Sequence, residues 1–301
     1  MTNFKVSIVI LNWNGLDDTV HCLESLEKIT YPNYDIVVVD NGSKGDDAEI
    51  LREKFKGYIH IIENDKNYGF AEGCNIGMRY ALKNSHPDYI LLLNNDTVVG
   101  PDFLSELVKI AERNPSIGIT GPKIYFYDEP NRLQSAGAVI DWCQGKTPLI
   151  GPGEIDKGQF EEIKDVDWVI GCALLIKRRA LEEIGLLYPK YFAFFEETEW
   201  CVRCKKAGFR IIYVPRAKLW HKSQRTTGKP EGFLLYYTTR NRFLFMRRNS
   251  TRLQLFFFLI YFFLRDFWPT SALLLIKERN LKLFINFLRG VGNGIILVII
   301  D

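Results

Sequence analysis

Residues 89–97 read Tyr-Ile-Leu-Leu-Leu-Asn-Asn-Asp-Thr, an apolar run that gives way abruptly to amides and a carboxylate. The unbroken apolar run 90–93 is typical of a strand that is buried on both faces, as in a parallel sheet. Open α/β sheets bind ligands at the carboxyl ends of such strands. Asp96 would present a ligand for a hard divalent cation there, and such a cation suits a substrate diphosphate. A plain Asn/Asp turn explains the same residues. The other motifs must therefore decide between a ligand-binding strand end and an ordinary turn.

Two earlier stretches follow the same pattern. Residues 6–11 (VSIVIL) end at Asn12-Trp13, and residues 35–39 (DIVVV) end at Asp40. Helical patterns and short connections separate these runs, which predicts a parallel α/β sheet. One edge of that sheet could hold a nucleotide, with the base near Asn12 and Trp13 and the ribose or base near Asp40. Each strand end taken singly is also explained by an ordinary turn.

Composition and missing motifs exclude several classes of protein. The 301 residues are 47% hydrophobic and 25% charged with a net charge of +3, which is typical of a globular protein and does not favour nucleic acid as a partner. Neither G-x-G-x-x-G nor a Walker lysine loop follows the first strand. Cys201 and Cys204 have metal-like spacing, but they share a helix face and are expected to pack. The scattered cysteines favour a reducing cytosol, and no signal peptide is expected.

The strand ends also carry a family resemblance. The runs VSIVILNWNG, IVVVDNGS, NYGFAEGCNIG and LLLNNDT together resemble family 2 glycosyltransferases of the GT-A fold, and most of all their rhamnosyltransferase-like branch. The resemblance implies an α/β fold with a Rossmann-like, mostly parallel sheet and flanking helices. It also implies an inverting enzyme that uses a nucleotide-diphosphate sugar, such as a UDP- or dTDP-sugar, together with Mg²⁺ or Mn²⁺.

The same resemblance implies roles for individual residues. Asn94-Asn95-Asp96 falls where the family carries D-x-D, so Asp96 is expected to be the main anionic metal ligand. His221 is expected to join the metal or the diphosphate, although a lone histidine is equally well explained as structural. Arg240, from an Arg-Asn pair, is a candidate for binding a phosphate. The other candidate donor-binding residues are Asn12, Trp13, Asp40, Asn67, Asn75 and Asn95.

A second cluster of acids lies near residue 197. Lysines followed by Gly208 predict a helix C-terminus, which places Glu196, Glu197 and Glu199 in the first turn, where the helix dipole favours anions. Helix capping alone would explain these acids. The aromatic run ahead of them could also desolvate one carboxylate and raise its pKa, as a general base requires. The resemblance implies that the second acid, Glu197, is the catalytic base.

Three local expectations concern a helix start, a strand and a loop. Asp17 or Asp18 is expected to cap the helix after the first strand. Residues 167–177 are expected to form one apolar strand with Gly171 inside it, where a ligand or another backbone comes close. Residues 128–164 are rich in glycine, proline and charge and predict a hairpin with mobile loops. Such loops either close over a donor sugar or form a plain surface excursion.

The C-terminal segment mixes aromatic, basic and apolar residues. Residues 253–264 carry no charge, but a membrane-spanning helix needs about twenty apolar residues. Joining them to residue 276 would place Arg265-Asp266 in the middle of the bilayer. Helices that lie in the membrane surface are therefore expected. Burial against the catalytic domain or in a homodimer is the alternative, and a true span ranks third.

Taken together, these patterns predict a GT-A domain over residues 1–230 and a helical, membrane-associating extension over residues 231–301. The expected partners are a nucleotide-diphosphate sugar, a glycan or lipid-linked acceptor in cell-surface polysaccharide assembly, and the cytoplasmic face of the cell membrane, where the protein would be peripheral. A non-catalytic nucleotide-sugar-binding scaffold is the rival, supported by Asn94 and by Glu197 where aspartate is commoner. A nucleotidyltransferase would need a basic, glycine-rich loop after the first strand, and Asn12-Trp-Asn-Gly lacks the basic residues.

Overall fold

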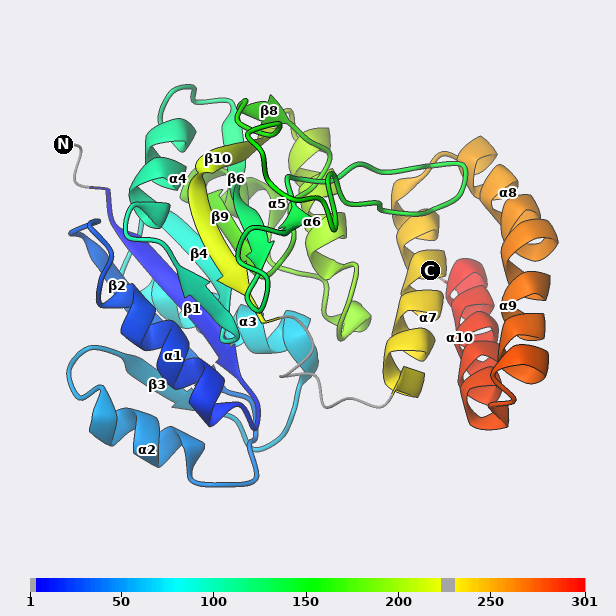
Figure 1. The fold of residues 1–301 in the computed structure, drawn as a ribbon, viewed down its shortest axis with the longest axis horizontal. Coiled ribbons are helices and arrows are strands. Elements are labelled where there is room, and N and C mark those ends of the chain that lie inside the picture. The colour runs from blue at the N-terminus through cyan, green and yellow to red at the C-terminus, as the bar shows by residue number, and fades with distance from the viewer. Residues whose placement is uncertain (1–3, 223–230, 301) are drawn as a thin grey trace.

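Residues 4–222 and 231–300 are described by the computed structural model. Their centre is a mixed, mostly parallel sheet with the strand order β3-β2-β1-β4-β9-β6-β10-β5, to which β7 and β8 are attached by pairing with β6 and β10 (Figure 1). The strands are β1 Val6–Asn12, β2 Tyr34–Asp40, β3 His60–Glu63, β4 Tyr89–Asn94, β5 Thr97–Val99, β6 Ile117–Phe126, β7 Leu133–Ser135, β8 Lys164–Asp165, β9 Ala173–Lys177 and β10 Arg210–His221. The helices of this body are α1 Leu16–Leu26, α2 Asp47–Lys54, α3 Gly69–Asn84, α4 Phe103–Ala111, α5 Arg178–Ile184, the short helix Pro189–Tyr191 and α6 Glu196–Lys206.

Helices cover both faces of the sheet, because successive side chains along a strand point to opposite sides. Ile8 and Ile10 of β1 join the core formed with α1, α2 and α4. Val9 joins the core formed with α3, α5 and α6. The prediction of an α/β fold with a mostly parallel sheet and flanking helices is confirmed.

Parallel pairing brings three polar strand ends to one edge. β1 pairs in parallel with both β2 and β4, so that Asn12 lies opposite Asp40 and Leu11 lies opposite Asn94. The residues that follow β4 therefore lie beside the end of β1. This edge is the one at which open α/β folds bind their ligands.

Two of the local expectations were wrong in detail. The residue that caps α1 is Gly15, while Asp17 and Asp18 lie inside the first turn and make no side-chain cap. β9 begins only at Ala173, where its antiparallel pairing with β4 starts. Gly171 lies in the turn before the strand rather than inside it. The stretch 128–164 contains β7 and several isolated antiparallel bridges, among them Asp141 with Lys146.

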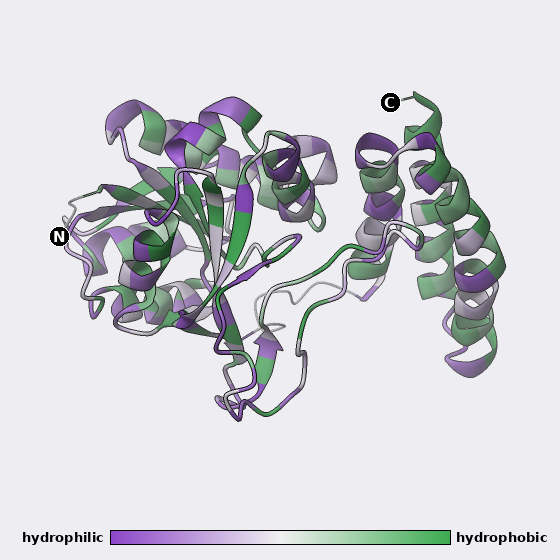
Figure 2. Ribbon diagram, turned by 90° about the horizontal axis from the view of Figure 1, so that it is seen from above, coloured by the Kyte–Doolittle hydropathy of each residue, from purple (hydrophilic) through white to green (hydrophobic). Residues whose placement is uncertain are grey.

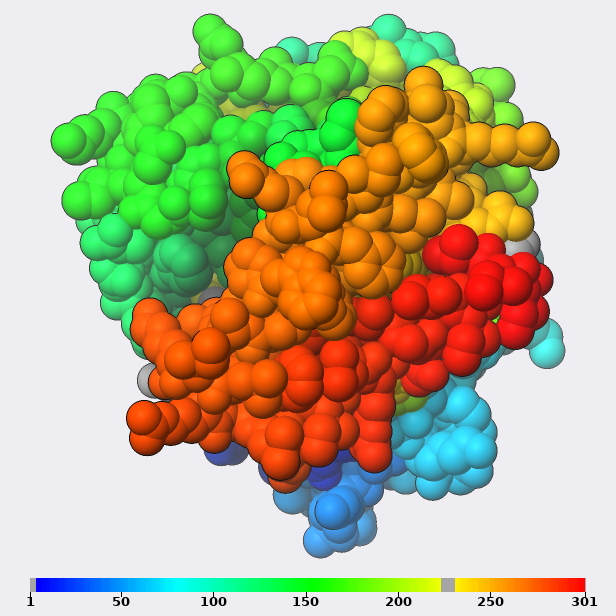
Figure 3. Space-filling view, turned by 90° about the vertical axis from the view of Figure 1, so that its right-hand side faces the viewer, coloured from blue at the N-terminus to red at the C-terminus, as the bar shows by residue number. Residues whose placement is uncertain are grey.

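The chain ends in a group of long helices beside the α/β body (Figure 2). They are α7 Glu231–Asn249, α8 Arg252–Tyr261, α9 Trp268–Ala272 and α10 Leu281–Ile300, and π-helical turns make 252–277 one continuous helix of 26 residues. This helix lies beside α10 in the space-filling view (Figure 3). α10 packs closely on α7, because a Cβ at Gly290 would lie 2.8 Å from the carbonyl oxygen of Tyr236 and one at Gly294 would lie 2.7 Å from the ring of Phe243.

A loop of the body reaches these helices. Trp142 stacks on Phe245 of α7 with a centroid distance of 5.5 Å, and Arg242 Nε donates to the carbonyl oxygen of Gln144 at 3.0 Å. A Cβ on Gly145 would lie 2.9 Å from the side chain of Met246, so only glycine lets the loop come this close. The C-terminal helices are therefore attached to the body by direct side-chain contacts.

The C-terminal helices expose a broad apolar surface. Of the 22 large hydrophobic side chains that are exposed among the described residues, 16 follow residue 252. By length and composition alone, Arg252–Lys277 and Leu281–Ile300 could each cross a membrane. The helix continues through Arg265-Asp266, where the Asp266 carboxylate turns inward and accepts from Arg242 at 2.6 Å and from Lys146 at 3.3 Å.

Candidate active site

A closed polar network occupies the ends of β1 and β2. Asn12 is fully buried, and its Nδ2 donates to Asp40 Oδ1 at 2.7 Å and to Asp47 Oδ2 at 2.9 Å. Its Oδ1 accepts from Thr19 Oγ1 at 2.8 Å. Asp40 also accepts the backbone N–H of Ser43 at 3.1 Å. Asn12 therefore fixes the position of Asp40, the carboxylate expected to contact the nucleoside.

Asn95 belongs to the same network, whereas Trp13 only borders it. Asn95 Nδ2 donates to Thr19 Oγ1 at 2.9 Å, which ties the end of β4 to α1. Trp13, the next residue after Asn12, is half-buried.

The side chains of Asn67 and Asn75 form hydrogen bonds with other parts of the fold. Asn67 Oδ1 accepts from Asn41 Nδ2 at 3.0 Å and from the backbone N–H of Gly69 at 2.7 Å. Asn75 is 1% exposed and forms a pair of hydrogen bonds with the backbone of Leu187, at 3.0 Å from the N–H and 2.9 Å to the carbonyl. These contacts give both amides a structural role, because they hold α3 and the turn before it in place.

Asp96 and His221 face one another, although 125 positions separate them in the sequence. His221 Nε2 lies 3.1 Å from Asp96 Oδ1, and His221 Nδ1 lies 2.8 Å from Gln134 Oε1. Because an amide oxygen can only accept, this contact places a hydrogen on Nδ1. In the neutral ring Nε2 is then an acceptor facing a carboxylate, so either a proton or a cation must lie between them.

This geometry fits a divalent cation. Ligands at roughly 2.1 Å from Mg²⁺ are about 3 Å apart when they are neighbours in an octahedron. Asn94 Oδ1, two residues before Asp96 in the chain, is buried without a hydrogen-bond partner in the described chain and is a further acceptor at the end of β4. Among residues 4–222 and 231–300 no cluster of three or more Asp, Glu, His or Cys side chains could hold a metal by itself. A diphosphate and water would have to complete the coordination shell, as is common for Mg²⁺.

A lysine that the sequence analysis did not single out lies next to this pair. Lys222 is 8% exposed, and its backbone N–H donates to the carbonyl of Asp96 at 2.9 Å. Its ammonium group donates to Asp18 Oδ1 at 2.7 Å and lies 3.0 Å from His21 Nδ1. The only signal in the sequence was its position directly after His221.

The aromatic segment before α6 has an unusual backbone. Phe192, Phe194 and Phe195 all have positive φ, at 65°, 70° and 74°. Such conformations are strained for bulky residues and persist only when the surroundings hold them. The carbonyl of Phe192 accepts the backbone N–H of Phe70 at the start of α3, at 2.6 Å. On its other side the segment is held by Asn241 of α7.

Asn241 is fully buried and supports three carbonyls of this segment. Its Nδ2 lies 2.9 Å from Tyr191 O, 2.7 Å from Ala193 O and 2.8 Å from Phe194 O. The preceding Arg240 donates to Tyr191 O at 3.0 Å and lies over the ring of Tyr237 at 4.8 Å. Arg240, the candidate for a phosphate, is thus already engaged by the segment. The sequence offered the Arg-Asn pair as a signal, but not the role of its second member.

Glu197 lies in the first turn of α6, as predicted, and is half-buried, with its Oε2 shielded from solvent. Burial raises the pKa of Glu197, and backbone hydrogen bonds at Glu197, Gly171 and Thr198 oppose the rise. Its Oε2 has no hydrogen-bond partner among the described residues. A Cβ at Gly171 would lie 3.2 Å from the Glu197 side chain, so this glycine lets the turn pack on the carboxylate.

The turn 171–172 connects Glu197 with the end of β4. Cys172 O accepts the backbone N–H of Asn94 at 2.9 Å. Burial raises the pKa of the Cys172 thiol, and the charges of Asp96 and Glu197 raise it further. This turn therefore packs on the Glu197 side chain through Gly171 and is hydrogen-bonded to the end of β4 through Cys172.

Glu199 has a different environment from Glu197. It is 1% exposed, and both of its oxygens accept from Arg203 Nε at 3.0 Å. Arg203 also donates to the carbonyl of Leu186 at 2.7 Å. This ion pair ties α6 to the end of α5, which is a structural role.

The fold and the polar strand ends define a GT-A-type glycosyltransferase, and sequence comparison shows the family. The model of Glycosyl transferase family 2 matches residues 7–185, so the chain belongs to this family. It is 26% identical over 242 residues to the low-salt glycan biosynthesis hexosyltransferase Agl10 of Haloferax volcanii, covering 79% of this chain and 74% of that protein. It is 25% identical over 268 residues to the dTDP-rhamnosyl transferase RfbF of Shigella flexneri, covering 84% and 83%.

Other relatives differ in length or are only distantly similar. An uncharacterised protein, y4gI of Sinorhizobium fredii, is 30% identical over 234 residues, but the chain spans only 25% of its length. The mannosyltransferase PcManGT of Pyrobaculum calidifontis, solved with GDP-Man and Mn²⁺, superposes with a TM-score of 0.60 at 14% identity, covering 99% of this chain and 86% of that one. TarS of S. aureus, solved with UDP-GlcNAc, gives a TM-score of 0.62 at 14% identity, covering 98% and 81%. These two structures support the fold.

Proposed function

We propose that this enzyme transfers a sugar, with inversion, from a nucleotide-diphosphate donor to a glycan or lipid-linked acceptor in cell-surface polysaccharide assembly. The observation that carries the proposal is the Glu197 carboxylate, whose Oε2 is buried without a hydrogen-bond partner among the described residues and whose side chain packs on the turn that is hydrogen-bonded to the end of β4. The names of relatives point the same way, since one is an N-acetylglucosaminyl-diphospho-decaprenol L-rhamnosyltransferase. A UDP- or dTDP-sugar is the proposed donor.

In the proposed reaction Glu197 removes the proton from an acceptor hydroxyl. The hydroxyl oxygen then forms a bond to the anomeric carbon while the bond from that carbon to the diphosphate oxygen breaks on the opposite face, which inverts the configuration. The electron pair of the broken bond leaves with the nucleoside diphosphate. Asp40 and Trp13 would bind the nucleoside, and Asn12 and Asn95 would keep this edge in shape.

Mg²⁺ or Mn²⁺, when bound, would stabilise the negative charge of the leaving diphosphate. Asp96 and His221 would hold it, with Gln134 fixing the ring of His221. Lys222 lies next to this pair and adds a positive charge that a diphosphate would favour. Asn94 in place of the first aspartate lowers the negative charge of the site, so metal affinity should depend strongly on the bound donor.

A screen of nucleotide sugars for hydrolysis or transfer, with and without Mn²⁺, tests this function directly. Turnover of a sugar nucleotide that is lost in Asp96→Ala supports the enzyme. The scaffold alternative predicts donor binding by calorimetry without any turnover. In the same experiment Asp40→Ala should weaken nucleotide binding even without metal.

We further propose that residues 1–230 are the GT-A domain and residues 231–301 an extension that attaches the protein to the cytoplasmic face of the cell membrane. The exposed apolar surface of the C-terminal helices supports this arrangement, because such a surface is unfavourable in water. The inward ion pairs of Asp266 keep its charge away from lipid. A helix that lies in the interface and one that spans both fit this surface, and carbonate extraction separates them.

A further inference from the structure

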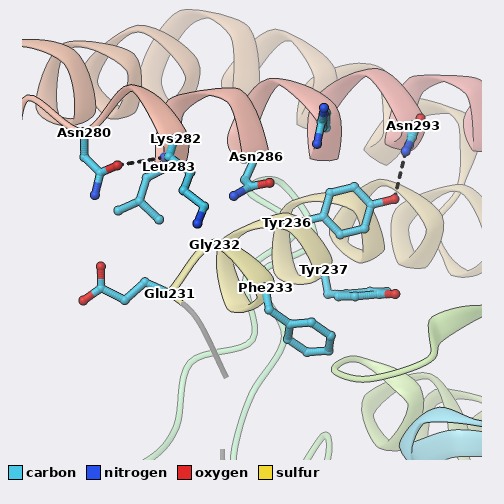
Figure 4. A pocket seen from close by; sticks show the side chains of 11 residues that line it. Glu231, Gly232, Phe233, Tyr236, Tyr237, Asn280, Lys282, Leu283, Asn286 and Asn293 are labelled. Carbon is cyan, nitrogen blue, oxygen red and sulfur yellow. Dashed lines mark hydrogen bonds between the residues drawn. The ribbon is translucent and has the colours of Figure 1, made fainter. Parts of the chain in front are cut away.

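A pocket of about 680 Å³ lies between the first turns of α7 and the length of α10 (Figure 4). Its walls include the rings of Phe233, Tyr236 and Tyr237 from α7. Gly232 lets the two helices approach here, because a Cβ on it would lie 2.2 Å from Asn286 Nδ2. The pocket is separate from the polar strand ends described above, and the proposed reaction does not use it.

The polar groups that line this pocket from α10 are mostly donors. Lys282 and Arg289 both line it, and neither makes an ion pair or a hydrogen bond with any residue that the structure describes. Asn286 and Asn293 add amides, and Asn293 Nδ2 donates to the hydroxyl of Tyr236 at 2.8 Å. The acid among the lining residues is Glu231 at the start of α7. Unpaired cations beside amide donors form a suitable environment for phosphate oxygens.

The arrangement on α10 fits a ligand that is polar at one end and apolar at the other. Positions 282, 286, 289 and 293 are spaced by four, three and four residues, which places them on one face of the helix. Ile285, Leu288 and Ile296 are exposed on the same helix at 41%, 39% and 50%. The anion-binding face therefore borders the apolar surface that we propose contacts lipid.

The pocket also adjoins the catalytic half of the molecule. The ring of Phe233 contacts those of Phe192 and Phe194, with centroids 6.2 Å and 6.4 Å away, and Tyr237 stacks on Phe192 at 5.1 Å. These phenylalanines belong to the strained segment that leads into Glu197. One wall of the pocket is thus shared with the segment that carries the candidate base.

We propose that this pocket binds the diphosphate of a lipid-linked acceptor, with Lys282 and Arg289 contacting the phosphate oxygens. The lipid chain would lie along the apolar face of α10, and the sugar would extend past Phe192 and Phe194 toward Glu197. This inference rests on the proposed function only for the identity of the ligand as an acceptor. The binding of a lipid diphosphate in the pocket can be measured without any turnover.

The test compares two double variants of the full-length protein. Lys282→Gln with Arg289→Gln removes the charges that line the pocket. Arg265→Gln with Lys277→Gln removes the same charge from exposed positions of the neighbouring helix, outside the pocket and without partners in the described chain. Calorimetry in EDTA, which keeps metal-dependent diphosphate binding at Asp96 from contributing, measures the affinity for farnesyl diphosphate and for inorganic diphosphate.

The expected result is a loss of about tenfold or more in farnesyl diphosphate affinity for the pocket variant, since each lost charge-assisted bond contributes substantially, and near-native affinity for the control. Inorganic diphosphate should bind the native protein more weakly than farnesyl diphosphate does. Both double variants should bind equimolar phosphatidylglycerol–phosphatidylcholine vesicles equally well. Hydrolysis of the donor should be unchanged in the pocket variant, while transfer to a lipid-linked acceptor falls.

Three results would overturn the inference. One is equal farnesyl diphosphate affinity in the two double variants. Another is equal affinity of the native protein for inorganic and farnesyl diphosphate, which indicates a site for a free anion. The third is a selective loss of vesicle binding in the pocket variant with farnesyl diphosphate binding intact, which indicates a contact with bulk phospholipid. Absence of donor turnover in every protein would instead contradict the proposed function and leave these binding results valid.

Discussion

Opposing influences act on the protonation of Glu197. Burial destabilises its charged form, while backbone N–H groups stabilise it, and burial is the larger effect. A carboxylate balanced in this way is ionised at neutral pH only at a cost in folding free energy. Function and stability therefore make opposite demands on this residue.

Replacing Glu197 by Gln should raise the thermal stability of the protein at neutral pH. A group whose pKa is raised by folding contributes stability below its unfolded pKa and loses that contribution as the pH rises through the folded pKa. At pH 7.5 the native protein bears the cost of a charged, half-buried Glu197, and the neutral glutamine of Glu197→Gln avoids this cost. Below the ordinary pKa of glutamate, Glu197 is protonated in both states, so the difference in stability between the two proteins should vanish. Melting temperatures of the two proteins across this range check the prediction, and a stability difference that grows on acidification would contradict it.

Gly171→Ala should reduce transfer by displacing the Glu197 carboxylate. The new methyl group would lie 3.2 to 3.4 Å from three atoms of the Glu197 side chain, so that side chain has to shift by a few tenths of an ångström. We expect a fall in kcat of about tenfold, with little change in the donor KM, because positioning of the base affects the chemical step. Gly45→Ala, where the nearest atom would be 3.6 Å away, is the control and should be near normal. Equal activity of the two variants would show that the carboxylate position is not critical.

For single residues, the sequence predicts proximity where the pattern of strands determines it. Asn12 and Asp40 end two strands that pair in parallel, so locating these strands in the sequence is enough to predict that the two residues lie side by side. The contact of Asn75 with Leu187 could not be predicted, because the two residues lie 112 positions apart and no local pattern links them. Gln134 escaped notice for the same reason, since its contact with His221 spans 87 positions.

At the scale of elements, the strained segment between Tyr191 and α6 contacts both the α/β body and the C-terminal helices. α3 holds it through the backbone N–H of Phe70, and α7 holds it through Asn241. The segment cannot relax to ordinary backbone angles while both contacts persist. The position of the first turn of α6, and hence of Glu197, therefore depends on a helix of the C-terminal group.

Asn241→Ala should lower the rate of transfer far more than the equivalent change at Asn249. Both amides are buried on α7, but Asn249 donates to the carbonyl of Phe245 in its own helix at 3.0 Å. Loss of the Asn241 contacts leaves carbonyls of the strained segment without donors, which costs about 1–3 kcal/mol and frees the segment. We expect a tenfold or larger fall in kcat for Asn241→Ala, with donor affinity retained. Equal effects of the two variants on melting temperature and on kcat would assign both residues to stability alone.

The elements themselves were predicted well where hydrophobic periodicity was strong. β1, β2, β4 and α6 begin or end within a residue or two of the expected positions. The inward orientation of Asp266 could not be predicted from the sequence. The partners that accommodate Asp266 come from α7 and from the loop near residue 146, and a local pattern cannot reveal them.

At the scale of the whole molecule, the C-terminal helices combine a buried core with an exposed apolar face. Phe243 of α7 is fully buried, and its ring contacts those of Phe258 and Phe262 and lies against Gly294 of α10. Removing the chain from residue 253 onward would therefore expose this ring and destabilise the fold. Substitution on the exposed face is the cleaner way to test membrane attachment.

Replacement of Phe256, Leu264 and Trp268 by Ser should release the protein from liposomes. These side chains are 56%, 68% and 66% exposed, so their replacement removes lipid contacts and leaves the core intact. High salt should release part of the native protein as well, because basic groups attract anionic lipid through screened charge. A triple control on the body, Ile50, Ile155 and Ile163 to Ser, should remain bound in co-sedimentation. Unchanged binding of the first variant would place the membrane contact elsewhere, and resistance of the native protein to carbonate would indicate a true span.

The single-turnover rate of Glu197→Gln tests the central claim most directly. Glutamine keeps the size and polarity of the side chain but cannot accept the acceptor's proton. We expect normal donor binding and a rate of transfer lower by on the order of a hundredfold or more, the usual contribution of a positioned base. Glu196→Gln should retain most of the rate, and Glu199→Gln should lose stability through its broken pair with Arg203 rather than chemistry. A Glu197→Gln enzyme that transfers sugar at a near-native rate would contradict the account.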